Sequence, residues 1–170
     1  MTTYRRGAAT LLAVILCARQ KITLSAQSKG EVNSIVISKS AHTLSLMSGR
    51  TVLKTYRVAL GRGSSEAKQF AGDNRTPEGK YIIDEKKTST KFHKALHISY
   101  PNAEDRARAG KLGKSPGGDI EIHGLPASLA WVGTKQHMLD WTEGCIALSN
   151  EEIDEVWQLV SKGTSVEINP

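Results

Sequence analysis

Hydrophobic and polar residues alternate along most of the chain after residue 30, in short runs separated by glycine and by Asn or Asp turns. A period of two places successive side chains on opposite faces of a β-strand. The runs predicted to be strands are Val32 to Ser38, Thr43 to Met47, Thr51 to Leu60, Lys80 to Glu85, Ala95 to Tyr100, Asp119 to His123 and Thr164 to Ile168. Each run is too short for a helix with a buried stripe, so the pattern predicts a mainly β domain with two packed sheets.

One segment near the C-terminus has the period of an amphipathic helix instead. Ser149 followed by Glu152 is a capping-box pattern, which marks a helix start. The apolar positions that then share one face are Ile153, Val156, Trp157 and Val160. Gly163 ends the segment, and a second, short helix is predicted over Ala103 to Ala109. We expect the C-terminal helix to cover an edge or a face of the sheets.

Two longer connections lie between the predicted strands. Gly61 to Asn74 contains three glycines and reads as a long loop that either borders a cleft or only turns the chain. The stretch that carries Trp131 and Trp141 is interpreted as a lid over a cleft, with ordinary packing as the alternative.

A chain of 170 residues has room for one domain of ordinary size, after allowance for its first segment. Arg5 and Arg6 precede an apolar run, Ala8 to Ala18, that is too short to span a bilayer. Residues 1–26 are therefore predicted to be an export signal, with an uncleaved amphipathic membrane anchor as the alternative. Residues 31–169 form the domain, which this interpretation places in the periplasm or cell envelope.

The net charge of +6 is concentrated at the N-terminus. The first 26 residues contain four of the 23 basic residues and none of the 17 acidic ones, so the rest of the chain is close to neutral. A nearly neutral domain does not indicate a basic surface that binds nucleic-acid phosphates, so no nucleic acid is expected as a partner. The local run of Lys86, Lys87, Lys91 and Lys94 is interpreted as a solvated loop surface. We expect a monomer.

Without residues 1–26, Cys145 is the single cysteine. A lone thiol in an oxidising compartment is either a small buried hydrophobe or a reactive group. Gly144 before it allows a sharp turn and exposes a backbone N–H that suits an oxyanion hole. The alternation of Asp119 to His123 puts His123 on the face opposite Ile120 and Ile122, and an imidazole within hydrogen-bond reach converts a thiol to a thiolate. The spacing alone leaves an inert cysteine and a surface histidine open.

Other histidines give no metal-ligand spacing. His93 and His97 are four residues apart, but the alternation around His97 is that of a strand, which places His97 on a polar face near the site. No metal site is predicted from one cysteine and scattered histidines.

The motif around His123 and Cys145 resembles the L,D-transpeptidase (YkuD-type) catalytic domain. The family pattern is His-Gly, a spacer, and then Ser/Thr-His-Gly-Cys-hydrophobic-Arg, and the chain has His123-Gly124 followed by the sequence TEGCIAL over Thr142 to Leu148. Further matching segments are Val58 to Gly61, Gly72-Asp73, Thr76 to Tyr81, Leu96 to Asn102 and Gly117 to Ile120. The resemblance covers residues 31–169.

The resemblance implies an L,D-transpeptidase-like β-sandwich of mixed sheets with one amphipathic helix near the C-terminus. Cys145 would attack a peptidoglycan stem peptide at the bond between the L-centre of a diamino acid and D-Ala, which forms a thioester and expels D-Ala. His123 would be the base, and the N–H groups of Gly144 and Cys145 would hold the oxyanion. The acyl group would pass to an amine of a neighbouring stem peptide, giving a crosslink, or to water. No metal or organic cofactor is implied.

The chain departs from the family pattern at two positions. Glu143 replaces the second histidine and Ala147 replaces the arginine, which could pair with a substrate carboxylate. Donor recognition is therefore expected to be supplied elsewhere, by Arg62, Arg75 or Lys91. Glu143 would disfavour a thiolate unless it points away from Cys145 or orients His123. The residues expected to bind substrate are His97, Glu143, Gly124 and Arg75.

Two other functions remain open at this point. One is an L,D-specific peptidoglycan amidase or carboxypeptidase, which passes the acyl group to water. The other is a non-catalytic peptidoglycan-binding module whose cysteine is a relic. The catalytic reading predicts a His123 ring nitrogen within about 4 Å of the Cys145 sulfur.

Overall fold

A computed structural model describes residue 1 and residues 30–88 and 91–170. The predicted export signal, including Cys17 and apart from Met1, lies outside the described residues. Within the described ranges, no helix is both long and apolar enough to cross a membrane.

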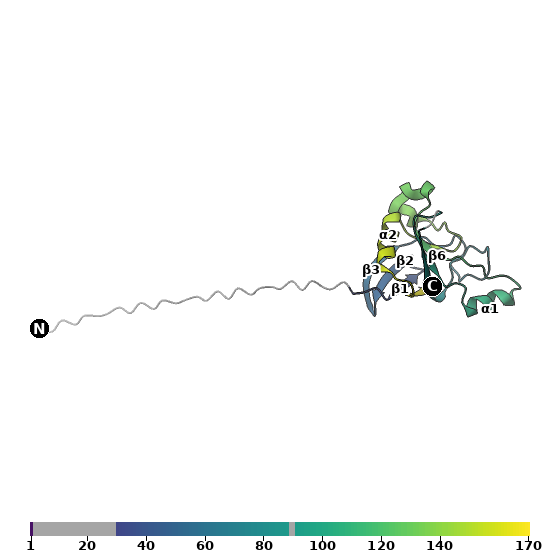
Figure 1. Ribbon diagram of the computed structural model, residues 1–170, viewed down its shortest axis with the longest axis horizontal. Helices are drawn as coiled ribbons and strands as arrows, with labels where there is room; N and C mark the ends of the chain where they lie inside the picture. Colours follow the sequence, from purple (N-terminus) through teal and green to yellow (C-terminus); the bar gives the residue numbers. More distant parts are fainter. Residues whose placement is uncertain (2–29, 89–90) are drawn as a thin grey trace.

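The domain is mainly β, as the alternation predicts (Figure 1). The strands are β1 (Ser34–Ser38), β2 (Thr43–Ser48), β3 (Thr51–Arg57), β4 (Gly79–Lys87), β5 (Ala95–Ile98), β6 (Glu121–His123), β7 (Ile146–Ala147) and β8 (Ser165–Asn169). They form one sheet in the order β3-β2-β1-β8-β4-β5-β6-β7. The β1–β8 and β6–β7 pairs are parallel and the other pairs are antiparallel, so the sheet is mixed.

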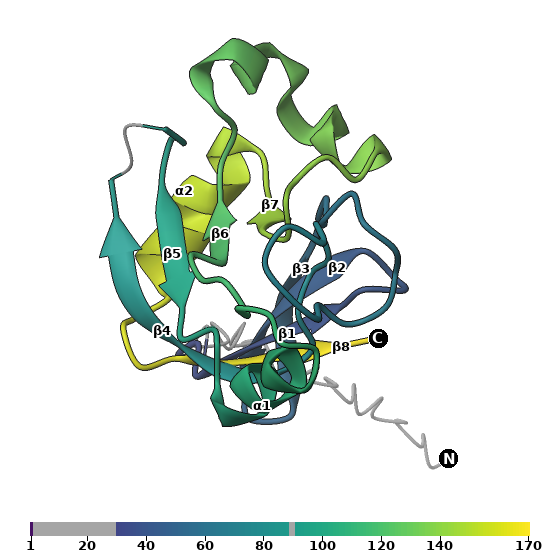
Figure 2. The same cartoon turned by 90° about the vertical axis from the view of Figure 1, so that its right-hand side faces the viewer.

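Strand β4 belongs to both halves of this sheet. Its first residues, 79–82, pair with β8, and the register with β5 begins at Ile83 and shifts before Glu85. A bulge of this kind bends a strand, and Figure 2 shows the sheet curling along β4. The predicted mixed arrangement of strands is confirmed, and the two predicted sheets are two halves of one curled sheet.

Two α-helices and a 3₁₀ segment complete the fold. α1 (Ala103–Lys111) and α2 (Asn150–Leu159) both begin with a capping box, formed by Asn102 with Asp105 and by Ser149 with Glu152. Ile153 and Val156 on α2 are fully buried in the core, and Trp157 is partly buried against it. The predicted amphipathic helix is thereby confirmed.

The core combines the buried side chains of the strands with those of α2. Its fully buried members near the end of the sheet that carries the site are Leu96, Ile98, Ile122, Ile146, Leu148 and Ile153. Burying each such side chain stabilises the fold by roughly 1.5–3 kcal/mol. The strands β5, β6 and β7 are therefore held firmly, although β6 and β7 are short.

Two local differences from the predicted elements matter for the site. The strand from Thr51 ends at Arg57, and the chain continues to Gly61, where isolated bridges join Ala59 to Ala147 and Gly61 to Thr142. The 3₁₀ segment η1 (Ala127–Met138) was not predicted; it lies beyond the ends of β6 and β7 in Figure 2.

Candidate active site

A single cavity of about 820 Å³ contains both Cys145 and His123. This volume is within the usual range for small-molecule sites. The lining residues belong to the loop 62–74, to the end of β4 and the residues before β5, to the segment 117–126 that contains β6, and to the segment 141–145 before β7. Cavity walls therefore come from four stretches that are far apart in the sequence.

Strand pairing sets the order of these walls. β5 pairs with one side of β6, β7 pairs with the other, and the segment around Ala59 and Gly61 bridges to β7 and to the residues before it. Lys91 and Phe92 therefore lie beside β6, near the start of β5. In the loop 61–74, Arg62 lies beside Thr142 before β7, whereas Ala71 contacts Ser115 and Gly117 before β6. His123 ends β6, whereas Cys145 directly precedes β7.

His123 is buried, with 1% of its surface exposed. Its Nδ1 lies 2.7 Å from the carbonyl oxygen of Gly124. Because a carbonyl oxygen only accepts, Nδ1 carries the hydrogen and the lone pair of the neutral ring is on Nε2. The ring stacks on Phe92, with centroids 3.7 Å apart, and meets the edge of Trp141. Burial lowers the pKa of His123 to about 4, so the imidazole is neutral near pH 7.

Cys145 is partly buried and its thiol donates a hydrogen bond to the carbonyl oxygen of Asp119 at 3.6 Å. Burial is the largest cause that raises the pKa of Cys145 to about 11. The Glu121 carboxylate acts in the same direction, whereas the Glu121 backbone N–H and the charges of Lys91 and Lys68 act against it. The thiol is therefore protonated near pH 7. The sulfur thus lies between the Asp119 carbonyl oxygen and the Glu121 backbone N–H, and the expected approach of a His123 nitrogen to within about 4 Å of the sulfur stays a prediction.

The turn before Cys145 is held by Thr142. The Thr142 hydroxyl donates to the Cys145 carbonyl oxygen at 2.7 Å and accepts from the Gly144 N–H at 3.2 Å. Gly144 has φ +132°, and a Cβ at this position would lie 2.7 Å from the carbonyl oxygen of Arg75. Both the backbone conformation and the close approach require glycine here.

The cavity brings together some of the residues expected in the site and not others. Cys145, His123 and Glu143 line it, whereas Gly144, His97, Gly124 and Arg75 do not. Arg75 pairs with Glu66 at 2.9 Å. His97 lies between Asp84, at 2.6 Å from its Nδ1, and Asp119, at 3.8 Å from its Nε2.

Glu143 points toward Arg62, whose Nη2 lies 3.1 Å from its carboxylate, and its side chain is 76% exposed. Glu143 was expected to disfavour a thiolate unless it points away from Cys145 or orients His123. It points away, since its carboxylate faces Arg62. The acidic residue that acts on the thiol is Glu121, which is paired with Lys87 at 3.2 Å. The signal for Glu121 was in the sequence, because alternation puts it on the same face as His123.

The interpretation of the lysine run as a solvated loop surface is wrong for most of its members. Lys86 donates to the carbonyl oxygens of Trp157 and Val160 at the C-terminal end of α2. Lys94 pairs with Asp154 at 2.6 Å. Lys87 and Lys91 line the cavity. Spacing along the chain could not reveal these contacts, because the partners belong to distant elements.

The described residues contain no group of three or more His, Cys, Asp or Glu side chains that could hold a metal ion. The same ranges contain one free cysteine, Cys145. The described lining of the cavity places a thiol, a neutral imidazole and several charged side chains around one space.

Comparison with known proteins finds a family match and related structures. Residues 33–168 match the family described as YkuD, the L,D-transpeptidase catalytic domain. The protein named "Putative L,D-transpeptidase YafK" of Escherichia coli (strain K12) is 33% identical over 112 residues, which are 65% of this chain and 38% of that protein. The chain thus spans well under half the length of this curated relative.

Solved structures share the fold. The helical cell shape determining protein Pgp2 from Campylobacter jejuni is 25% identical with a TM-score of 0.61, over 82% of this chain and 48% of that one. Bd1075 of Bdellovibrio bacteriovorus is 21% identical with a TM-score of 0.56, over 82% and 48%. An L,D-transpeptidase from Mycobacterium smegmatis is 18% identical with a TM-score of 0.54, over 82% and 59%. The last two show likeness of fold alone.

Proposed function

Because the chain belongs to the L,D-transpeptidase catalytic domain family, we propose that it is a cysteine acyltransferase that acts on peptidoglycan stem peptides in cell-wall crosslinking or remodelling. The observation that carries the proposal is that Cys145, directly before β7, and His123, at the end of the adjacent parallel strand β6, line one cavity. The hydrogen bond from His123 Nδ1 to the Gly124 carbonyl supports it, because this bond leaves Nε2 as the basic nitrogen.

The first half-reaction starts from a neutral thiol and a neutral imidazole, since burial raises the pKa of Cys145 to about 11 and lowers that of His123 to about 4. The sulfur attacks the carbonyl carbon between the L-centre of the diamino acid and D-Ala, and the thiol proton passes to His123 Nε2 as the C–S bond forms. The imidazolium then gives this proton to the amine of D-Ala as the C–N bond breaks. A thioester on Cys145 and free D-Ala result.

The second half-reaction reverses these proton movements. An amine of a second stem peptide, or water, attacks the thioester carbonyl while His123 Nε2 takes its proton. The C–S bond breaks and the proton returns to the Cys145 sulfur. Gly124 is a positioning residue in both halves, because its carbonyl oxygen holds the ring and favours the transient imidazolium.

Backbone N–H groups beside Cys145 supply the oxyanion contact. The Cys145 N–H makes no hydrogen bond to the described residues, whereas the Gly144 N–H is engaged by Thr142 at 3.2 Å. We therefore assign the oxyanion first to the Cys145 N–H. Gly144 contributes through its φ of +132°, which allows the turn that presents this donor.

The proposed setting is the periplasm or cell envelope, in line with the export signal predicted in residues 1–26. A monomer is sufficient, because both reacting side chains come from one chain. The steps use only protein groups and substrate, so no metal or organic cofactor takes part.

The test is incubation of the purified protein with defined stem tetrapeptides, followed by mass spectrometry of the products and of the intact protein. New peptide dimers together with a thioester mass on Cys145 support transpeptidation. Release of D-Ala without dimers assigns the domain to the hydrolytic alternative. Acylation by a carbapenem reports on the thiol independently of the peptide.

Two variants control this experiment. Cys145→Ala removes the nucleophile and should abolish both the acyl-enzyme and turnover. His123→Gln keeps a neutral side chain of similar size and should slow acylation by 10²-fold or more, about the contribution of a general base. Full peptide binding with no product from the wild-type protein would mean that the chain is a non-catalytic binding module.

A further inference from the structure

Four basic side chains line the cavity, and their ion partners differ. Arg62 pairs with the exposed Glu143 at the rim. Lys87 pairs with Glu121 and Glu85 on the β6 side. Lys91 lies 5.2 Å from the centre of the Phe92 ring. The fourth is Lys68, in the loop that starts at the bridge to Thr142 and whose Ala71 N–H donates to the carbonyl oxygen of Ser115 before β6.

Lys68 differs from the others because it is buried. Lys68 and its partner Asp73 are each only 4% exposed, and Nζ lies 2.8 Å from the Asp73 carboxylate. An ammonium group has three N–H donors. Only this one has an acceptor among the described residues, although Lys68 lines the cavity.

Asp73 is fully occupied within its own loop. Its carboxylate accepts hydrogen bonds from Lys68 Nζ and from the backbone N–H groups of Gln69, Phe70 and Arg75. Burial raises the pKa of Asp73, but these hydrogen bonds outweigh burial and hold the pKa below its ordinary value. The Asp73 carboxylate is therefore ionised near pH 7. Because the Asp73 carboxylate also accepts hydrogen bonds from three backbone N–H groups, it neutralises the Lys68 ammonium only in part.

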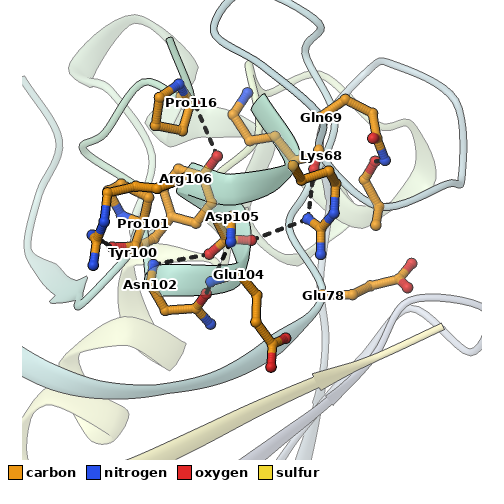
Figure 3. Close-up of polar contacts among 12 residues, drawn as sticks. Lys68, Gln69, Glu78, Tyr100, Pro101, Asn102, Glu104, Asp105, Arg106 and Pro116 are labelled. Carbon is orange, nitrogen blue, oxygen red and sulfur yellow. Dashed lines mark hydrogen bonds and ion pairs between the residues drawn. The ribbon is translucent and has the colours of Figure 1, made fainter. Parts of the chain in front are cut away.

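The backbone of Lys68 is anchored on both sides. Its N–H donates to the carbonyl oxygen of Thr76, and its carbonyl oxygen accepts from Arg108 of α1 at 3.0 Å. Arg108 also pairs with the buried Asp105, which accepts from Asn102 at the start of α1. Figure 3 shows Lys68 beside this network. A cation on such a rigid backbone is preorganised to bind an anion.

The proposed reaction decides which part of the substrate faces Lys68. His123 must be next to the leaving amine in the first half-reaction and next to the incoming amine in the second. Both amines therefore lie beside His123, whose ring stacks on Phe92. The acyl half of the donor stays on the sulfur, and Lys68 lines the same cavity close enough to Cys145 for its charge to act against the rise in the pKa of the thiol.

We infer that Lys68 binds a carboxylate on the acyl half of the donor peptide and so determines which donors the site accepts. This inference rests on the proposed function. Ala147, which replaces the family arginine, is fully buried in β7 and does not line the cavity. A cation from a different element thus supplies the carboxylate contact that Ala147 lacks.

The acyl half of a stem peptide offers two sources of carboxylate, so the experiment uses matched tetrapeptides. One series replaces diaminopimelate by lysine, which removes the carboxylate at the end of the diamino acid side chain. A second series replaces the glutamyl α-carboxylate by its amide. A third amidates the C-terminal carboxylate of D-Ala, which belongs to the leaving half. D-Ala release gives kcat/KM for each peptide.

Wild-type kcat/KM should fall by about ten- to hundredfold when one of the two acyl-half carboxylates is removed, the range expected for a charge-assisted hydrogen bond. In Lys68→Met this preference should disappear, because the kcat/KM of the peptide that carries the acyl-half carboxylate falls to that of the peptide without it. The effect of amidating D-Ala should be the same in both proteins. Lys68→Arg should restore part of the preference, and Lys80→Met, an exposed lysine on β4, should retain all of it.

Loss of Lys68 leaves Asp73 without its cation, so Lys68→Met could fail to fold. The double variant Lys68→Met/Asp73→Asn removes both charges and gives the same comparison, with circular dichroism as the check of folding. If either variant keeps the wild-type preference, or the wild type has no preference on the acyl half, the role of Lys68 is refuted. If the wild type turns over none of the peptides, the proposed function itself is refuted and the inference falls with it.

Discussion

The ring of His123 stacks on the ring of Phe92, with centroids 3.7 Å apart and an angle of 13° between the planes. Phe92 comes from the connection between β4 and β5, whereas His123 ends β6. The stack covers one face of the imidazole, and the Gly124 carbonyl holds its Nδ1. The pair therefore sets both the orientation of the base and the degree to which water reaches it.

Shortening Phe92 should change the pH dependence of turnover. Burial is the largest cause that lowers the pKa of His123 to about 4, so Phe92→Leu, which admits water, should raise this pKa toward 6.5. The acidic limb of kcat/KM, where the base becomes protonated, should move to higher pH by about one unit. Phe92→Tyr preserves the stack and should leave the limb in place. An unshifted limb in Phe92→Leu would mean that Phe92 does not control the desolvation of the base.

The same burial should make the stability of the fold depend on pH. The pKa of His123 is about 4 in the folded state and 6.5 as the ordinary value. Between these values the unfolded chain binds a proton that the folded chain does not, so stability falls as pH decreases from 6.5 to 4. The contribution of His123 to this fall is about 3 kcal/mol, from 1.36 kcal/mol per pKa unit.

Urea denaturation at several pH values measures this effect. His123→Gln, which cannot be protonated, should lose less stability than the wild type between pH 6.5 and 4. His137→Gln is the matched control, since His137 lies on the partly exposed η1 segment and should retain the wild-type slope. Equal slopes in the wild type and His123→Gln would contradict a buried, neutral His123.

Local patterns in the sequence were sufficient for the parts of the site that depend on single strands and turns. The alternation around Ile122 places Glu121 and His123 on one face, and both line the cavity. The capping box at Ser149 gives the start of α2. Gly144 before Cys145 does adopt a backbone conformation that favours glycine. These features are set by neighbours along the chain, so they can be read from it.

The residues that surround Cys145 and His123 could not be predicted from such local patterns. Phe92 and Lys68 reach the cavity because β5 pairs with β6 and because the chain after β3 bridges to β7. These are contacts between distant segments, and no periodicity encodes them. The double role of β4 is similar, since an alternating run does not reveal that its partner changes from β8 to β5. Buried lysines such as Lys68 also look like surface residues in a sequence.

The Thr142 hydroxyl should matter for catalysis as well as for stability. It is buried, donates to the Cys145 carbonyl and accepts from the Gly144 N–H, so it ties together the turn that presents the thiol. Thr142→Val keeps the shape but removes both hydrogen bonds, which should lower the free energy of unfolding by about 1–3 kcal/mol. It should also slow acylation by a carbapenem, measured by intact mass. Thr142→Ser retains the hydroxyl and should acylate at close to the wild-type rate.

Equal acylation rates for Thr142→Val and Thr142→Ser would show that the hydroxyl is not needed to position the thiol. A loss of stability in Thr142→Val without any loss in rate would restrict its role to folding. Circular dichroism separates these outcomes, because it reports the folded fraction in the same samples.

Gly144 provides the sharpest test of the turn geometry. Its φ of +132° is rarely adopted by other residues, and a Cβ would lie 2.7 Å from the Arg75 carbonyl oxygen, which is backbone and cannot move aside cheaply. Gly144→Ala should therefore lower the free energy of unfolding by about 3 kcal/mol and displace the Cys145 N–H from the oxyanion position. Gly110 in α1 has no atom within 4 Å of its Cβ position, so Gly110→Ala should leave activity unchanged and stabilise the helix by about 0.5–1 kcal/mol. Thermal denaturation and acylation kinetics of the two variants measure both effects, and a Gly144→Ala protein that matches Gly110→Ala in both would contradict the role of this turn.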